Sequence, residues 1–218
     1  RLDSSSTSTF CRFIVALRSS VQDNESGRPL HRSTVAVNLR HRVVYRKLRM
    51  LVVGRTPVWE MPEFVALNRL PMRVPLTSYP TIAAARAGGE SPWRVPLDGT
   101  WRFKLVESPL AAPEDFAALQ HDDSAWGTIE VPGTWVRQGH DHPHYTNVVM
   151  PFACEPPATP AHNPTGLYRR TFRVPSSWRG RRVVLHVGSA DSVLLVHVNG
   201  VFVGLSKDSR LPAEFDLT

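Results

Sequence analysis

The sequence lacks several features that mark common classes of protein. It has two cysteines, Cys11 and Cys154, and neither has a second thiol or paired histidines at metal-binding spacing, so no disulfide framework or zinc site is indicated. Reduced thiols are typical of the cytoplasm, where we expect the protein to be. No apolar run approaches the roughly 18 residues of a membrane helix. The short apolar stretch Phe10–Leu17 has no small-residue cleavage site after it, so we expect neither a signal peptide nor a membrane partner.

Positive charge is concentrated at one end of the chain. The net charge is +7, and residues 1–50 carry ten basic and three acidic residues, which leaves the rest of the chain neutral overall. A basic footprint in one segment says nothing about the remainder, so we expect no nucleic-acid partner. The sequence also has no glycine-rich phosphate loop and no serine nucleophile elbow, which argues against nucleotide-dependent and serine-hydrolase chemistry.

The chain divides into three segments of different texture. Residues 1–50 have no sustained helical or strand period, and we expect a poorly ordered or non-native extension, with the natural start near Met50. Residues 51–95 contain six prolines and suggest a helical turn only at Ile82–Ala87, so this extended arm should lie along another surface. Residues 96–218 are predicted to form a β-sandwich.

Short apolar runs separated by Gly, Pro and Asp turns follow from residue 95 onward, a pattern typical of an antiparallel sandwich. The pattern predicts a short helix at 115–119, a turn at 122–126, and strands at 101–106, 128–131, 166–174, 182–187, 192–198 and 201–205. The dipeptide Asn199-Gly200 between two β-prone runs is a strong hairpin signal. Because the strands follow one another without helices between them, a parallel α/β sheet is excluded and the predicted fold is all-β.

Carboxylates are numerous in this region, but their contexts are those of turns and caps. Glycoside hydrolysis needs two carboxylates about 5–9.5 Å apart across a sugar. No pair stands at strand ends in a way that suggests a cleft, and most positions are usual for turn formers or helix caps. We therefore assign no catalytic residue among Asp115, Asp122, Asp123, Glu130, Asp141, Glu155, Asp191, Asp208, Glu214 and Asp216.

The stretch Gly139–His144 (GHDHPH) places three histidines around Asp141, a spacing that could gather a metal ion. Pro143 should splay these side chains, and no distant Cys or His partner is evident. A solvated loop is the favoured interpretation, and we assign no metal ligand here.

The sharpest local signal for a ligand is Tyr145-Thr146-Asn147. An asparagine amide offers both a donor and an acceptor to a hydroxyl group, and an aromatic ring can cover the apolar face of a sugar. A loop asparagine that satisfies nearby backbone groups fits the same residues. On the residues alone, both interpretations stay open.

Five blocks, in order, resemble the amino-terminal, sugar-binding part of glycoside hydrolase family 2 β-galactosidases. They are Val131–Trp135 (VPGTW), Tyr145–Val148 (YTNV), Asn163–Gly166 (NPTG), Val198–Gly200 (VNG) and Asp208–Leu217 (DSRLPAEFDL). Upstream, Trp59-Glu60, Asn68–Pro71 and Leu97–Phe103 fall in the same order. The resemblance covers roughly residues 57–218.

This resemblance implies a jelly-roll, galactose-binding-like β-sandwich, incomplete at its C-terminal end because a further strand is expected after Leu217. It implies retaining hydrolysis of terminal β-D-galactosides by two glutamates of a (β/α)₈ barrel that this chain does not contain, so we expect the chain alone to be inactive. Asn147 corresponds to a substrate-binding asparagine, with Tyr145 beside it. The implied partners are a β-galactoside, the remaining domains of the enzyme and further copies of it in a homo-oligomer.

The family's magnesium site is implied to take ligands from positions that here are Val58, Met61 and Lys207. The side chains of Val58 and Met61 carry no oxygen, and a lysine ammonium repels a dication. We therefore predict that no magnesium site forms on this chain as it does in those relatives. Mg²⁺ and Na⁺ remain expectations for a full-length family enzyme only.

The block Asp208–Leu217 is interpreted as scaffold. Asp208 and Arg210 should pair or hold loop backbone, while Leu211 and Phe215 should pack inward. Three function classes stay open: a β-galactosidase fragment, a stand-alone carbohydrate-binding module, and an interaction segment that complements a subunit through residues 51–95.

Overall fold

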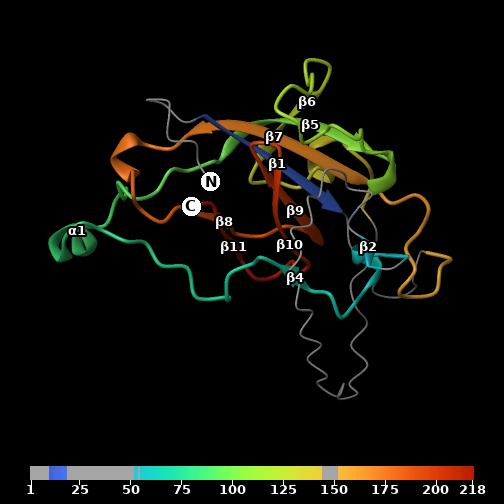
Figure 1. The fold of residues 1–218 in the computed structure, drawn as a ribbon, viewed down its shortest axis with the longest axis horizontal. Helices are drawn as coiled ribbons and strands as arrows, with labels where there is room; N and C mark the ends of the chain where they lie inside the picture. Colours follow the sequence, from blue (N-terminus) through green and yellow to red (C-terminus); the bar gives the residue numbers. More distant parts are fainter. Residues whose placement is uncertain (1–9, 19–51, 54, 144–151) are drawn as a thin grey trace.

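The computed structural model describes residues 10–18, 52–53, 55–143 and 152–218 (Figure 1). Strands form one large sheet of order β4-β10-β9-β1-β7-β5-β6, a smaller sheet of β8 and β11, and a short β2-β3 pair. The strands are β1 (Phe10–Arg18), β2 (Val52–Val53), β3 (Thr56–Pro57), β4 (Ala66–Leu67), β5 (Gly99–Val106), β6 (Gly127–Val131), β7 (Thr165–Arg173), β8 (Val184–Val187), β9 (Val193–Val198), β10 (Val201–Ser206) and β11 (Ala213–Asp216). The helical elements are α1 (Ile82–Ala87) and the 3₁₀ turns η2 (Val58–Glu60), η3 (Pro109–Ala111), η4 (Val136–Gln138) and η5 (Ser176–Trp178).

Both faces of the large sheet bury side chains, which explains why β9 is apolar at every position except the buried His197. Leu194 packs in the cluster that the large sheet shares with Phe215 of the smaller sheet. Its neighbour Leu195 packs in the cluster on the opposite face, together with Trp59 and Phe116. Because successive residues of a strand point to opposite faces, a strand covered on both sides is expected to be mostly apolar. The predicted all-β sandwich is confirmed.

The other predicted strands are confirmed to within two residues at each end. The hairpin between β9 and β10 is also confirmed: Asn199 and Gly200 have φ angles of 52° and 79°. Positive φ at both central residues matches the right-handed twist of the flanking strands, which is why this dipeptide favours a tight hairpin.

Strand β1, blue in Figure 1, lies within the large sheet between β7 and β9. Its register places Val15 opposite Tyr168 on one side and opposite Val196 on the other. The expectation of no regular structure over residues 1–50 is wrong for these nine residues. Pairing with strands some 150 residues away leaves no local period in the sequence, so a short apolar run could not be told from a loop. The start near Met50 and the boundaries at residues 50 and 95 stay predictions.

The prediction of a short helix at 115–119 is wrong. Residues 114–120 form consecutive turns, with the amide of Phe116 donating to the carbonyl of Pro113 (3.1 Å) and that of Ala118 to Asp115 (2.7 Å). The Arg169 guanidinium donates hydrogen bonds to the carbonyls of Phe116 and Ala118, which in an α-helix would accept from backbone amides of the helix itself. A charge-assisted bond to a buried arginine outweighs one short turn of helix.

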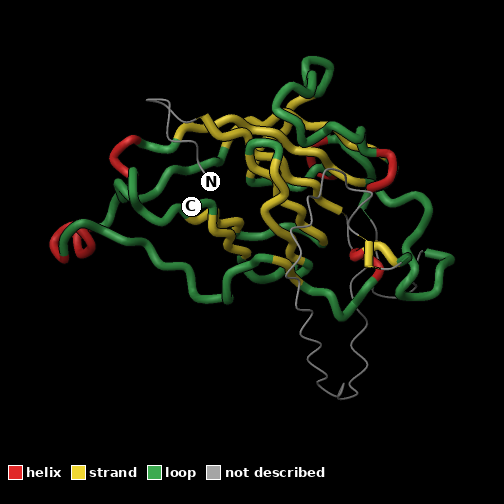
Figure 2. The backbone as a smooth tube through the Cα atoms, in the orientation of Figure 1, coloured by secondary structure: helices red, strands yellow, loops and turns green. Residues whose placement is uncertain are grey.

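The segment from residue 55 to residue 95 follows an extended path around α1, as Figure 2 shows in green and red. Thr81 caps α1, its Oγ1 accepting from the Ala84 amide at 3.1 Å. The segment lies against the sandwich: the Asn68 side chain donates to the carbonyl of Val203 (2.9 Å), and the Leu70 amide donates to that of Glu214 (2.8 Å). None of the helices in the described ranges has the length and apolar character to cross a membrane.

Candidate functional site

The predicted sugar-binding residue Asn147 and its neighbour Tyr145 lie outside the described residues, which break off between Pro143 and Phe152. The assignment therefore stays a prediction. The structure does describe the two blocks that flank this segment, VPGTW before it and NPTG after it. Hydrogen bonds and close packing fix the backbone of both blocks.

The approach on the N-terminal side is the block VPGTW at the end of β6. The Gln138 side-chain amide forms two hydrogen bonds with the backbone of Glu130, accepting from its N–H (2.8 Å) and donating to its carbonyl (3.0 Å). A Cβ on Gly133 would lie 2.8 Å from Gln138 Nε2 and 3.0 Å from the Glu130 carbonyl. Glycine at this position lets the two Gln138–Glu130 hydrogen bonds form without a shift of either partner. These bonds fix the direction in which the chain leaves the sheet.

The approach on the C-terminal side is the block NPTG that leads into β7. The backbone N–H of Asn163 donates to the backbone carbonyl of Glu107 (2.8 Å). A Cβ on Gly166 would come within 2.8 Å of Trp135 and Tyr168 and 2.9 Å of Phe103. Gly166 thus lets Trp135 of the first block pack directly on the second. The long connection between them leaves from and returns to one aromatic cluster.

The predicted metal-binding alternative at Gly139–His144 gains no support from the described part of the loop. His140 packs its ring on Phe103, with centroids 4.7 Å apart. His142 is largely exposed and pairs with Asp141, Nδ1 to Oδ1 3.0 Å. The two imidazoles face different surroundings, and His144 lies outside the described residues. Across the described ranges, no group of three or more His, Cys, Asp or Glu side chains could hold a metal ion.

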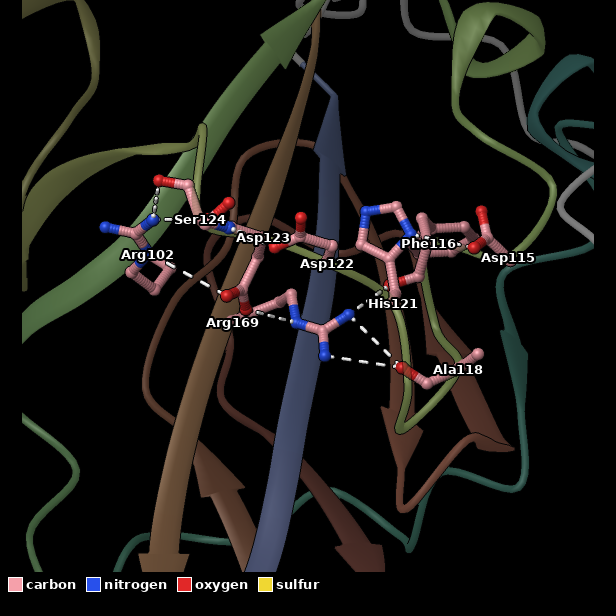
Figure 3. Close-up of polar contacts among 9 residues, drawn as sticks. All are labelled: Arg102, Asp115, Phe116, Ala118, His121, Asp122, Asp123, Ser124 and Arg169. Carbon is pink, nitrogen blue, oxygen red and sulfur yellow. Dashed lines mark hydrogen bonds and ion pairs between the residues drawn. The ribbon is translucent and has the colours of Figure 1, made fainter.

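A polar cluster surrounds the buried arginine Arg169, as Figure 3 shows. Arg169 of β7, whose side chain is 3% exposed, pairs through Nε with Asp123 Oδ2 at 2.9 Å. Its Nη1 donates to the carbonyls of Phe116 (2.8 Å) and Ala118 (3.3 Å), and its guanidinium lies 5.8 Å from the centroid of the Trp126 ring. One arginine therefore ties the 113–126 connection to the sheet.

Two further contacts brace the same connection. Arg102 of β5 donates to the carbonyls of Asp123 and Ser124, the latter at 2.7 Å (Figure 3). His121 Nδ1 lies 3.0 Å from Asp115 Oδ2. That hydrogen bond lowers the pKa of Asp115 below its ordinary value. These carboxylates have structural partners and do not face one another as an acid and a base across a sugar would.

The block DSRLPAEFDL is interpreted as scaffold, and the structure describes two of the contacts expected of it. Asp208 accepts from the amides of Arg210 (3.0 Å) and Leu211 (3.3 Å), so it holds loop backbone. Phe215 is fully buried, but Leu211 is 46% exposed, so the prediction that it packs inward is wrong. The turn that Asp208 closes turns this residue outward before β11 begins.

Both carboxylates of β11 are engaged. Glu214 receives two hydrogen bonds from Arg73, each 3.0 Å, and lies 3.1 Å from His186 Nδ1. Asp216 accepts from the amide of Thr218 (3.0 Å) and from Arg182 (2.7 Å), and these bonds lower its pKa to about 2. Asp216 therefore does not resemble a catalytic acid, whose pKa would be raised toward neutrality.

Sequence reasoning missed Arg169 as the central buried cation. The signal was present in the alternation of β7, because Leu167 and Arg169 share one face of that strand and Leu167 is fully buried. The two adjacent arginines of the sequence therefore have opposite roles. Arg170 faces the other side, where it donates to the carbonyl of Thr100 at 3.1 Å.

Comparisons with known proteins identify relatives of the chain. Residues 95–218 match a family model described as "Glycosyl hydrolases family 2, sugar binding domain". A β-galactosidase of Psychromonas ingrahamii is 42% identical over 160 residues, and one of Aeromonas hydrophila subsp. hydrophila is 44% identical over 170 residues. Each match covers 73% of this chain and 16% of the relative, so the chain spans about a sixth of the length of these relatives. A third, from Vibrio cholerae, is 42% identical over 162 residues and shares the same coverage.

Proposed function

The chain belongs to glycosyl hydrolase family 2 through the sugar binding domain of that family, and from this premise we propose that it serves as the amino-terminal part of a β-galactosidase. The observation that carries the proposal is identity above 40% with proteins of that name over 73% of the chain. The proposed reaction is the hydrolysis of terminal β-D-galactosides. The catalytic glutamates would belong to a barrel outside these 218 residues, and the chain alone is expected to be inactive.

In this proposal the sandwich contributes scaffold and one sugar contact. The described carboxylates support the scaffold role, because Asp115, Asp123, Asp208, Glu214 and Asp216 each bind a structural partner. The sugar contact is Asn147, with Tyr145 beside it. Both ends of the connection that contains Asn147 pack on the aromatic cluster of Trp135, Tyr168 and Phe103. This packing would restrict the positions open to the loop, and a binding loop needs such restriction.

The proposed partners are a β-galactoside, the remaining domains of the same enzyme and further copies of that enzyme in a homo-oligomer. The proposed location is the cytoplasm. Support for the location comes from Cys154, which forms no disulfide in the structure.

A chimeric enzyme tests the proposal. The chain would replace the matching amino-terminal segment of the Aeromonas hydrophila β-galactosidase, and hydrolysis of o-nitrophenyl β-D-galactoside would be measured. We expect an active chimera, no hydrolysis by the 218-residue chain alone, and a rise of at least tenfold in KM on Asn147→Ala. The exposed Ser177→Ala is the matched control and should leave KM unchanged. A folded but inactive chimera, or hydrolysis by the chain alone, would contradict the proposal.

A subunit-complementing role is the second candidate, and the contacts of the extended segment favour it. Support comes from its hydrogen bonds to Val203 and Glu214, by which this segment lies against the sandwich of the same chain. Mixing the chain with the Aeromonas hydrophila enzyme that lacks its amino terminus should then restore hydrolysis in trans. A galactose-binding module that acts alone would instead give a calorimetric titration with galactose and no restored activity.

A further inference from the structure

Lys207, the first residue after β10, holds residues 58–65 from two directions. Its backbone N–H donates to the carbonyl of Val65 (3.0 Å). Its ammonium donates to the carbonyls of Val58 and Met61, the latter at 2.7 Å, and lies 6.0 Å from the centroid of the Phe64 ring. One side chain thus gathers the 3₁₀ turn η2 and the residues that follow it.

The position of the ammonium has the character of a cation site. The carbonyl oxygens of Val58 and Met61 converge on a single point, and oxygen atoms of this kind are the ligands that Mg²⁺, Ca²⁺ and Na⁺ take in proteins. The Phe64 ring adds the electron-rich face that attracts cations. A second cation could not share this point, since two unit charges about 3 Å apart repel by several kcal/mol even at an effective dielectric of 20.

The magnesium site that the family resemblance implies does not fit these residues. Val58 is buried at 3% exposure among Trp59 and Leu205, and its side chain offers no oxygen. Met61 likewise contributes only its backbone carbonyl. The Lys207 ammonium already occupies the position that a metal ion would take. No step of the proposed reaction involves this position.

We propose that the Lys207 ammonium is a built-in cation that replaces a bound metal ion in fastening the Val58–Val65 segment to the sandwich. Its consequence is a domain whose stability is indifferent to chelators and to divalent ions. This role of Lys207 rests on contacts within the chain and does not depend on the proposed enzymatic role.

Thermal unfolding of the 218-residue chain tests this inference. The wild-type midpoint should be the same, within 1 °C or so, in EDTA and in millimolar Mg²⁺. Lys207→Met keeps the aliphatic stem and removes the charge, and it should lower the midpoint by roughly 3–10 °C, since hydrogen bonds from a charged group are lost. Lys104→Met, at an exposed position of β5, is the matched control and should leave the midpoint within about 1–2 °C.

Hydrogen exchange locates the effect and keeps the test independent of global stability. In Lys207→Met, the amides of Met61 and Phe64 should exchange at least tenfold faster, while those of the β9-β10 hairpin should change by less. A wild-type midpoint that falls in EDTA or rises in Mg²⁺ would overturn the proposal, because a metal ion would then be bound. Unchanged exchange at residues 58–65 in Lys207→Met would also overturn it, because the ammonium would not be holding the segment.

Discussion

Arg169 and Asp123 form an ion pair, Nε to Oδ2 2.9 Å, inside the sandwich, where the arginine side chain is almost fully buried. Removing the arginine is costly, because the carbonyls of Phe116 and Ala118 lose a charged hydrogen-bond donor and Asp123, which is 31% exposed, loses its nearer cation. The pair also joins two parts of the chain that are far apart in sequence, so its loss should affect the whole domain.

We expect Arg169→Met to lower the free energy of unfolding by about 2–4 kcal/mol, as measured by urea denaturation, because two carbonyls lose a charged donor. The free energy of unfolding of Arg169→Lys should lie between those of Arg169→Met and the wild type, since an ammonium cannot reach Asp123 and the two carbonyls together. The control is Arg179→Met, an exposed arginine near η5, with an expected change within about 0.5 kcal/mol. Equal midpoints for Arg169→Met and Arg179→Met would show that the buried pair contributes nothing.

His197 of β9 should make stability depend on pH between about 4 and 6.5. Its ring is buried against Phe116 and Phe202, with centroids 5.3 Å away in each case, and burial lowers its pKa from 6.5 to about 4. The neutral imidazole is the form that the folded state favours. As the pH falls through 6.5, the unfolded chain binds a proton that the folded chain does not, so stability decreases until the folded pKa is reached.

The loss across that window should approach roughly 3 kcal/mol, which follows from a pKa difference of about 2.5 units. Urea denaturation at pH 7, 6, 5 and 4.5 measures it. His197→Leu should flatten the slope, whereas the exposed His162→Gln should preserve it. A slope that survives in His197→Leu would assign the effect to another group. The low pKa values of Asp115 and Asp216 act in a separate window, below about pH 4.

Sequence reasoning succeeded where the signal is local. The strands follow from a period of two, and the β9-β10 turn follows from the preference of Asn199-Gly200 for positive φ. Asp208 was correctly expected to hold loop backbone, because a carboxylate at a turn bonds to amides two and three residues ahead.

It failed where distant residues decide the outcome. The turns at 114–120 depend on Arg169, some 50 residues later, which takes two carbonyls of a would-be helix. Glu214 is paired with Arg73, 141 positions earlier in the sequence. Propensity and spacing carry no information on such pairs, so the buried polar network could be predicted only as a class of residue and not as particular contacts.

Strand β1 should be essential for the cooperative unfolding of the large sheet. Val15 is flanked by Tyr168 and Val196, so a proline there removes a backbone N–H in the interior of a sheet. We expect Val15→Pro to lower the free energy of unfolding by roughly 2–4 kcal/mol, from a lost ladder bond and the carbonyl it leaves unpaired. Leu76→Pro, at an exposed position outside any strand, is the control. Equal stability of the two variants would mean that residues 10–18 do not pair with β7 and β9.

Gly166 should be needed for the packing of the aromatic rings of Trp135, Tyr168 and Phe103. A methyl group at this position would lie within 2.9 Å of three aromatic rings, those of Trp135, Tyr168 and Phe103. Rings packed in a core cannot all retreat, so Gly166→Ala should cost about 1–3 kcal/mol in urea denaturation.

Gly127→Ala is the matched control for this substitution, because a Cβ there would meet its nearest neighbour, the carbonyl oxygen of Phe103, at an ordinary 3.7 Å. It also lies in a strand of the same sheet, and its stability should stay close to that of the wild type. In the chimeric enzyme, Gly166→Ala should additionally raise KM for o-nitrophenyl β-D-galactoside, since Trp135 anchors the approach to Asn147, whereas Gly127→Ala should not. A Gly166→Ala chimera that loses stability but keeps its KM would show that the packing of the aromatic cluster does not place the sugar-binding loop.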